Sequence, residues 1–148
     1  MSKCIFIVGL ALLAGCGGGV DPVDEYNTVK VTLPDGAVIR AEVMRREEDM
    51  RRGMMFRDSL PENRGMLFIH GSPGNYSYFM YQVKIPLDII WMDSRNTVVE
   101  ISENTPPCKT KASECPVYGG KQTALVVLEL AAGQAKKHGI RLGTTISF

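Results

Sequence analysis

The chain has 148 residues, 45% of them hydrophobic and 22% charged, which suits one domain with a substantial core and argues against long disorder. The formal net charge is +1; residues 1–15 carry Lys3 and no acid, so their removal leaves 16 basic and 16 acidic residues. A chain so close to neutral lacks the basic surface typical of nucleic-acid-binding proteins, and we expect no nucleic-acid partner.

The N-terminus predicts a lipoprotein signal peptide. Lys3 supplies a short positive start, and residues 4–13 form an uncharged, mostly apolar run that is too short to span a bilayer comfortably. The run leads into Leu-Ala-Gly-Cys at 13–16, which resembles the bacterial lipobox, where a signal peptidase cuts just before the cysteine. We therefore expect residues 1–15 to be removed and Cys16 to be lipidated. The alternative is a buried strand that happens to end in cysteine.

Residues 16–27 are predicted to be the lipidated cysteine and a flexible tether. Eleven flexible residues after Cys16 would span roughly 17–20 Å, which keeps the domain close to the membrane surface. Two or more acyl chains anchor a protein stably. Gly17, not aspartate, follows the cysteine. By resemblance to the sorting rule of enteric bacteria, this favours the outer membrane, facing the periplasm, if the source is Gram-negative.

The first elements of the exported domain are a predicted hairpin and a helix. Apolar residues alternate through 28–33 and again through 37–43, on either side of a Pro-Asp-Gly turn at 34–36. Residues 45–52 then change to helical spacing, with Glu47 and Arg51 four residues apart in the favourable order.

The remaining residues predict a β-rich domain with one more short helix, at 134–138. Short apolar or aromatic stretches, separated by turn residues, predict strands at 65–70, 76–83, 85–92, 97–101, 125–130 and 144–148. Residues 28–148 are therefore expected to form a single small α+β domain. Its short strands should be mostly antiparallel and barrel-like in arrangement, with two short helices.

The cysteines point to one disulfide. Cys4 leaves with the signal peptide and Cys16 takes the lipid, which leaves Cys108 and Cys115 as a pair in an oxidising compartment. They flank a polar stretch without apolar periodicity. A redox pair usually has two residues between its cysteines, and a metal site needs further ligands nearby. A structural disulfide is the favoured interpretation of the three.

Several blocks in order resemble one family, the domain-of-unknown-function family 192 (DUF192). The blocks are Arg-Gly-Met-Met-Phe-Arg at 52–57, Ser-Leu-Pro-Glu-Asn-Arg-Gly-Met-Leu-Phe at 59–68, Ile-Pro-Leu-Asp-Ile-Ile at 85–90, Val-Leu-Glu-Leu at 127–130 and Gly-Ile-Arg-Leu-Gly at 139–143. The resemblance covers roughly residues 29–148. It implies a small β-rich domain, exported or cytosolic, without a settled activity.

One block departs from the family pattern. Family members often have Phe-Trp-Met-Lys-Asn-Thr before the Ile-Pro-Leu-Asp block, whereas this chain has Tyr-Phe-Met-Tyr-Gln-Val at 78–83. Tyr81 and Gln82 thus replace the lysine and the asparagine. A site that relies on the lysine ammonium cannot be carried over, although a hydroxyl and an amide remain available.

Two carboxylates are candidate functional groups. Asp88 lies in the apolar run Pro-Leu-Asp-Ile-Ile-Trp at 86–91, where a carboxylate needs a partner. It is either structural, paired with Arg57 or Arg64 or bound by backbone N–H groups, or it is functional. Glu129, between Leu128 and Leu130, either faces solvent or joins Asp88 in a paired-carboxylate site.

Other chemistries have weaker support. Seven methionines remain after signal removal, and their thioethers could bind a soft metal such as Cu(I), but they are not tightly clustered and methionine also fills irregular cores. His70 and His138 are far apart in sequence. Ser72 lacks the glycine frame of a hydrolase nucleophile. We therefore expect no cofactor or metal.

The sequence favours a non-catalytic envelope lipoprotein that binds a small ligand or a protein partner. The predicted ligand-binding residues are polar groups on an apolar surface: Arg57, Arg64, Tyr81, Gln82, Asp88 and Glu129. The first alternative is an enzyme acting on cell-envelope polymers with Asp88 or Glu129 as acid or base. A methionine-based soft-metal binder is the second.

Overall fold

A computed structural model describes residues 27–148. The predicted signal peptide, Cys16 and most of the tether lie outside the described residues. Among residues 27–148, no helix is both long and apolar enough to cross a membrane.

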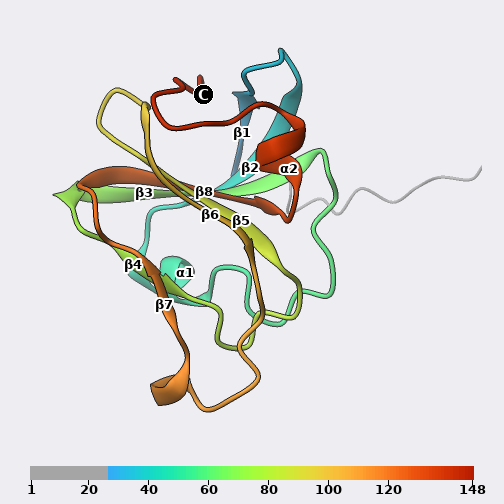
Figure 1. The fold of residues 1–148 in the computed structure, drawn as a ribbon, viewed down its shortest axis with the longest axis vertical. Helices are drawn as coiled ribbons and strands as arrows, with labels where there is room; N and C mark the ends of the chain where they lie inside the picture. Colours follow the sequence, from blue (N-terminus) through green and yellow to red (C-terminus); the bar gives the residue numbers. More distant parts are fainter. Residues whose placement is uncertain (1–26) are drawn as a thin grey trace, which may run out of the picture.

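A six-stranded sheet runs through the middle of the domain, in the order β1-β2-β3-β8-β5-β6 (Figure 1). Its pairings are antiparallel except for β2 with β3, which are parallel. The strands are β1 Thr28–Thr32, β2 Val38–Met44, β3 Arg64–Gly74, β5 Leu87–Met92, β6 Val98–Thr105 and β8 Ala124–Ala131. A separate two-stranded sheet pairs β4 (Ser77–Phe79) with β7 (Val117–Gly119).

Each face of the sheet buries its own apolar cluster, because successive side chains of a strand point to opposite faces. One cluster includes Ile90, Leu128 and Leu130 and is covered by residues that follow β8, among them Ala135 and Ile146. The other includes Phe68, Ile89 and Trp91 and lies under α1 (Glu47–Arg52) and β4. Figure 1 shows α2 (Gln134–Lys137) and the C-terminus on one side of the sheet, and α1, β4 and β7 on the other.

The predicted α+β class, the hairpin and both short helices are confirmed. The sheet does not close into a barrel, which corrects the barrel-like arrangement expected from sequence. Residues 144–148, predicted as a strand, instead form isolated bridges: Thr145 pairs with Thr97 and Ser147 with Thr32. This segment thereby connects the ends of β1 and β6, the two edge strands, without a continuous ladder.

The segment 76–83, predicted as one strand, is shorter in the structure. Only Ser77–Phe79 are in β4, and their partner β7 has no counterpart among the predicted strands. β7 lies close over the buried Trp91: a Cβ at Gly119, which has φ of +73°, would be 2.1 Å from the indole ring. Only glycine allows this approach.

Cys108 and Cys115 form a disulfide, as predicted, with their Cα atoms 5.7 Å apart. The bond closes a loop that contains a short 3-10 helix at Ala112–Glu114. Tyr81 forms a bridge with Cys108, so the loop is also tied to the segment after β4.

We expect reduction of this disulfide to destabilise the domain by about 2.5 kcal/mol, because the bond restricts the conformations of the unfolded chain. The effect is modest because the loop that the bond closes is short. Thermal melting with and without reductant measures the difference, and the Cys108→Ser, Cys115→Ser double variant should reproduce the reduced protein. Two free thiols in the denatured, non-reduced mature domain would contradict the bond.

Candidate functional site

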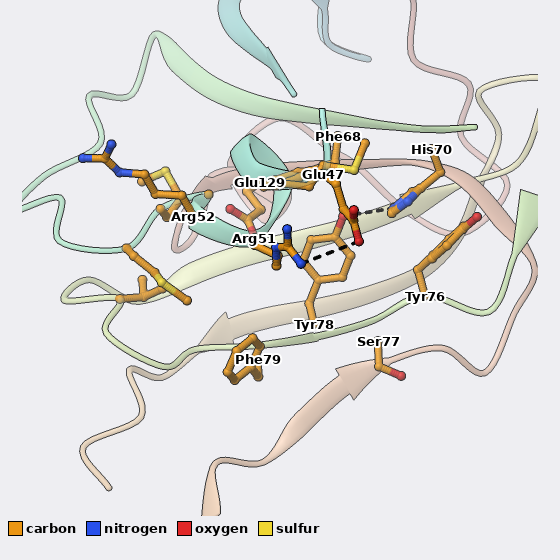
Figure 2. A pocket seen from close by; sticks show the side chains of 15 residues that line it. Glu47, Arg51, Arg52, Phe68, His70, Tyr76, Ser77, Tyr78, Phe79 and Glu129 are labelled. Atoms are coloured by element: carbon orange, nitrogen blue, oxygen red, sulfur yellow. Dashed lines mark hydrogen bonds and ion pairs between the residues drawn. The ribbon is translucent and has the colours of Figure 1, made fainter. Parts of the chain in front are cut away.

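An apolar pocket lies beneath α1, on the Trp91 face of the sheet. Its volume is about 340 Å³, in the range of small-molecule sites. α1 brings Met50 and charged residues, the segment after it brings Met54 and Met55, β3 and β4 bring aromatic rings, and β8 brings one acid (Figure 2). The lining residues are Glu47, Met50, Arg51, Arg52, Gly53, Met54, Met55, Phe68, His70, Tyr76, Ser77, Tyr78, Phe79, Val83 and Glu129.

Glu129 is the most unusual group in this pocket. Its residue is only 5% exposed, and its Oε2 atom is buried without a hydrogen-bond partner. β8 places it there because the strand alternates, so that Glu129 lies opposite Met66 and Ile89 on the Trp91 face. Burial raises the pKa of Glu129 to about 8, although the positive charge of Arg57 acts in the opposite direction. The carboxyl group is therefore largely protonated at neutral pH.

Aromatic side chains form a connected wall of the pocket. The Tyr78 ring packs edge-to-face on Phe68, with ring centroids 5.2 Å apart, and its hydroxyl hydrogen-bonds His70 Nε2 at 3.1 Å. His70 in turn stacks on Tyr76, with centroids 3.4 Å apart. Burial lowers the pKa of His70, which favours the neutral imidazole at pH 7. Burial and the nearby Glu129 charge both raise the pKa of Tyr78.

The two candidate carboxylates do not meet. Asp88 lies opposite Leu130 in the register of β5 and β8, whereas Glu129 lies opposite Ile89, so the two acids project from opposite faces of the sheet. Asp88 is fully buried and accepts hydrogen bonds from the backbone N–H groups of Asn104 and Ala135, each at 2.8 Å. The sequence left open whether Asp88 is structural or functional. These contacts fit the structural role, with backbone N–H groups as the partners.

The arginines expected at the site lie outside the pocket lining. The Arg57 guanidinium donates two hydrogen bonds to the Glu42 carboxylate, one of them 2.7 Å long, and these bonds raise its pKa. Arg64 begins β3, opposite Arg40 of β2.

Tyr81 and Gln82 also lie outside the pocket lining. Tyr81 stacks on Phe79, which is part of the pocket. Gln82 lines a neighbouring hollow with Phe56 and Pro107. Of the six candidate ligand-binding residues, the pocket therefore includes Glu129 alone.

Sequence reasoning missed the aromatic wall. Tyr76 and Tyr78 alternate with Ser77, and this spacing could have placed both rings on one face. Their position against His70 depends on how β3 continues to Gly74 and then turns back into β4, which no local pattern indicated. The sequence identified Glu129 as a candidate residue, but it did not predict that this side chain is buried.

Methionines contribute to both apolar clusters. Met54, Met66, Met80 and Met92 are at most 2% exposed. In residues 27–148, no group of three or more His, Cys, Asp or Glu side chains is placed to hold a metal ion.

The comparison with protein families gives one assignment. The model of family DUF192, described as "Uncharacterized ACR", matches residues 29–148. This chain belongs to the DUF192 family. The match spans the whole folded domain, from the second residue of β1 to the C-terminus.

Two solved structures resemble this DUF192 domain. A protein of unknown function from Novosphingobium aromaticivorans DSM 12444 is 30% identical, with a TM-score of 0.76 over 88% of this chain and 91% of the other. A putative transcription regulator from Sinorhizobium meliloti 1021 is 25% identical, with a TM-score of 0.70 over 81% and 91%. The comparison with curated proteins found no match.

At one departure from the DUF192 pattern, the structure shows a backbone conformation that suits the usual family residue. Gln82, which stands where family members often have asparagine, adopts a left-handed backbone with φ of 56°. Asparagine tolerates that conformation better than most residues. The Gln82 carbonyl accepts a hydrogen bond from the Phe56 N–H at 2.9 Å, which ties this residue to the segment after α1.

Proposed function

We propose that this protein is a small-ligand-binding domain of the bacterial envelope, held to a membrane by lipid on Cys16, and that its ligand occupies the pocket beneath α1. The observation that carries the proposal is Glu129, a buried carboxyl group with one oxygen that has no hydrogen-bond partner, in a pocket whose surface is mostly apolar. An unpaired polar atom of this kind costs folding free energy. A ligand that hydrogen-bonds this oxygen would remove that cost.

The shape and lining of the pocket support a ligand more than a macromolecular partner. Its volume is large enough for a small organic molecule. Its surface is mostly apolar with a few polar groups, which is the usual composition of a small-molecule site. The nearly neutral charge of the chain does not favour a nucleic-acid partner, although the Sinorhizobium relative is described as a putative transcription regulator.

We expect small aromatic molecules to bind in this pocket. In a ¹H–¹⁵N NMR titration with 2-phenylethanol and 2-phenylethylamine, shifts should concentrate at Gly53, Phe68 and Tyr78. Phe79→Ala, which removes a half-exposed ring from the pocket lining, should weaken binding about three- to tenfold. Phe56→Ala is the matched control, since Phe56 is comparably exposed and does not line the pocket. Shifts scattered over the surface, or equal effects of the two variants, would contradict the proposal.

Export and lipidation rest on the residues that precede the described domain. The charged start, the apolar run and the Leu-Ala-Gly-Cys sequence at 13–16 support both steps. The Cys108–Cys115 bond also fits an oxidising compartment, because such bonds are rare in the cytosol. For a Gram-negative source, Gly17 after the cysteine supports an outer-membrane location.

Cys16→Ala should release the protein into the soluble fraction or leave the signal peptide uncleaved, because the acceptor thiol is gone. Membrane fractionation and intact-mass measurement distinguish these two products from the anchored wild type. Mass spectrometry that finds an unmodified thiol at Cys16 in the mature wild-type protein would refute lipidation.

An enzyme acting on cell-envelope polymers is the second candidate, and the raised pKa of Glu129 favours it. A carboxylic acid that is still protonated near pH 7 can act as a general acid. Asp88 does not contribute in this scheme, because it lies on the opposite face with both oxygens bound by backbone N–H groups. Release of soluble fragments from purified cell-wall material by wild type, and not by Glu129→Gln, would support this candidate.

A further inference from the structure

We infer that the ligand of this pocket is a compact organic cation, an ammonium group on an apolar body, and that the Glu129 carboxylate pairs with the positive charge. The inference rests on the proposed function, since it names the ligand class for that same pocket. Three features of the described residues lead to it: the unsatisfied oxygen, the character of the walls and the pairing of the other charges.

The unsatisfied atom can only accept hydrogen bonds once Glu129 is ionised. Oε2 of Glu129 is buried and makes no hydrogen bond, although Arg57 is close enough to influence the carboxyl group electrostatically. The Arg57 guanidinium instead binds both oxygens of Glu42. A buried carboxylate is stable when it is both neutralised and hydrogen-bonded, and an ammonium group does both with a single short contact.

The walls suit a positive charge. Aromatic rings have negative faces that attract cations within about 6 Å, and the pocket includes Phe68, Tyr78 and Phe79. Met50 and Met54 add polarisable thioethers, which also pack against irregular apolar groups. The apolar body of the ligand would lie against these side chains while its charged end reaches Glu129.

The charged and titratable groups around Glu129 come from four elements and the segment after α1. They are Glu42 on β2, Glu47, Arg51 and Arg52 on α1, Arg57 after α1, His70 on β3, and Tyr76 and Tyr78 at β4. Arg51 pairs with Glu47 at 3.6 Å, Arg57 pairs with Glu42, and His70 is neutral at pH 7.

One cation remains at the pocket edge. Arg52 is exposed, and solvent and salt screen its repulsion of a bound ammonium. Glu129 is therefore the pocket acid whose charge has no direct ion-pair partner among the described residues.

Binding of an ammonium ligand should release a proton. Below pH 8 the empty pocket holds Glu129 as the neutral acid. When the ammonium group binds, the carboxyl group loses its proton to solvent and the ligand keeps its own, so the ion pair is neutral overall. The apparent dissociation constant should then fall by up to about tenfold per pH unit from pH 6 to 8, and level off above it.

Three probes with a common phenyl body test the charge preference: 2-phenylethylamine, 2-phenylethanol and 3-phenylpropanoate. Each is titrated by NMR or calorimetry into wild type and Glu129→Gln at pH 6, 7 and 8. We expect the amine to bind best to wild type, with affinity that rises with pH. Glu129→Gln should weaken amine binding at pH 8 by at least about tenfold, remove its pH dependence and weaken the amine far more than the alcohol.

The outcomes separate this inference from the proposed function. Equal binding of amine and alcohol, preference for the carboxylate probe, or unchanged amine binding in Glu129→Gln would overturn the cation and leave the pocket as the ligand site. If no probe perturbs residues of the pocket, both the inference and the proposed function fail. Melting curves of each variant verify that lost binding does not reflect unfolding.

Discussion

Replacing Glu129 with glutamine should stabilise the protein at pH 8 and change it little near pH 4.5. The pKa of Glu129 is about 8 in the folded protein and near the ordinary value of 4.5 when unfolded. Between these two pH values the unfolded chain releases the proton and the folded protein retains it. The free energy of unfolding therefore falls as pH rises from 4.5 to 8. Outside that range Glu129 adds no pH dependence. Glutamine cannot ionise and does not show this loss.

The expected effect is large for one side chain. When the folded protein holds one proton more than the unfolded chain, the free energy of unfolding changes by about 1.4 kcal/mol per pH unit. Between the two pKa values of Glu129 the total change is roughly 4 kcal/mol. In a domain of this size that corresponds to a difference in melting temperature on the order of 10 °C at pH 8. Melting curves of wild type and Glu129→Gln from pH 4.5 to 8.5 give the difference directly.

Two comparisons make this test specific. The lowered pKa of His70 adds an opposite pH dependence below about pH 6.5, but it is present in both proteins and cancels in the difference. Glu103→Gln is the matched control, because Glu103 is an exposed residue of β6, and its pH profile should follow wild type. If the pH profiles of wild type and Glu129→Gln run parallel over the whole range, the claim that Glu129 is a buried acid with a raised pKa is wrong.

Replacing Asp88 with asparagine should destabilise the protein by about 2–4 kcal/mol. The carboxylate joins the end of β6 to the first turn of α2 through the Asn104 and Ala135 N–H groups. An asparagine can accept one of these bonds, but its NH₂ group would face the other N–H. A buried donor would then be left unpaired, and a hydrogen bond to a charged acceptor would be lost.

Thermal melting of the purified proteins measures this effect, with Asp58→Asn as the control. Asp58 is highly exposed and pairs with Lys84, and surface pairs of this kind contribute little. A melting temperature for Asp88→Asn within about two degrees of wild type would contradict the structural role. Because Asp88 lies on the face opposite the pocket, the folded variant should also retain ligand binding.

Local patterns predicted the local elements well. The Pro-Asp-Gly turn and the alternation on both sides of it set the β1–β2 hairpin, since turn residues and side-chain period act within a few residues. The charge spacing within residues 45–52 predicted the helix that the structure places at α1, for the same reason. Cysteine number and spacing predicted the disulfide, because a short polar loop brings its own ends together.

The sequence by itself thus determined the class of fold, its family resemblance, the disulfide and two unusual carboxylates. Only the tertiary structure decided what those carboxylates do. Asp88 and Glu129 each lie between apolar residues in their strands, and their sequence neighbourhoods look alike. The register of β5 with β8 places them on opposite faces, where Asp88 meets two N–H donors and Oε2 of Glu129 meets none. Register and long-range packing depend on residues far apart in the chain, and no local pattern contains that information.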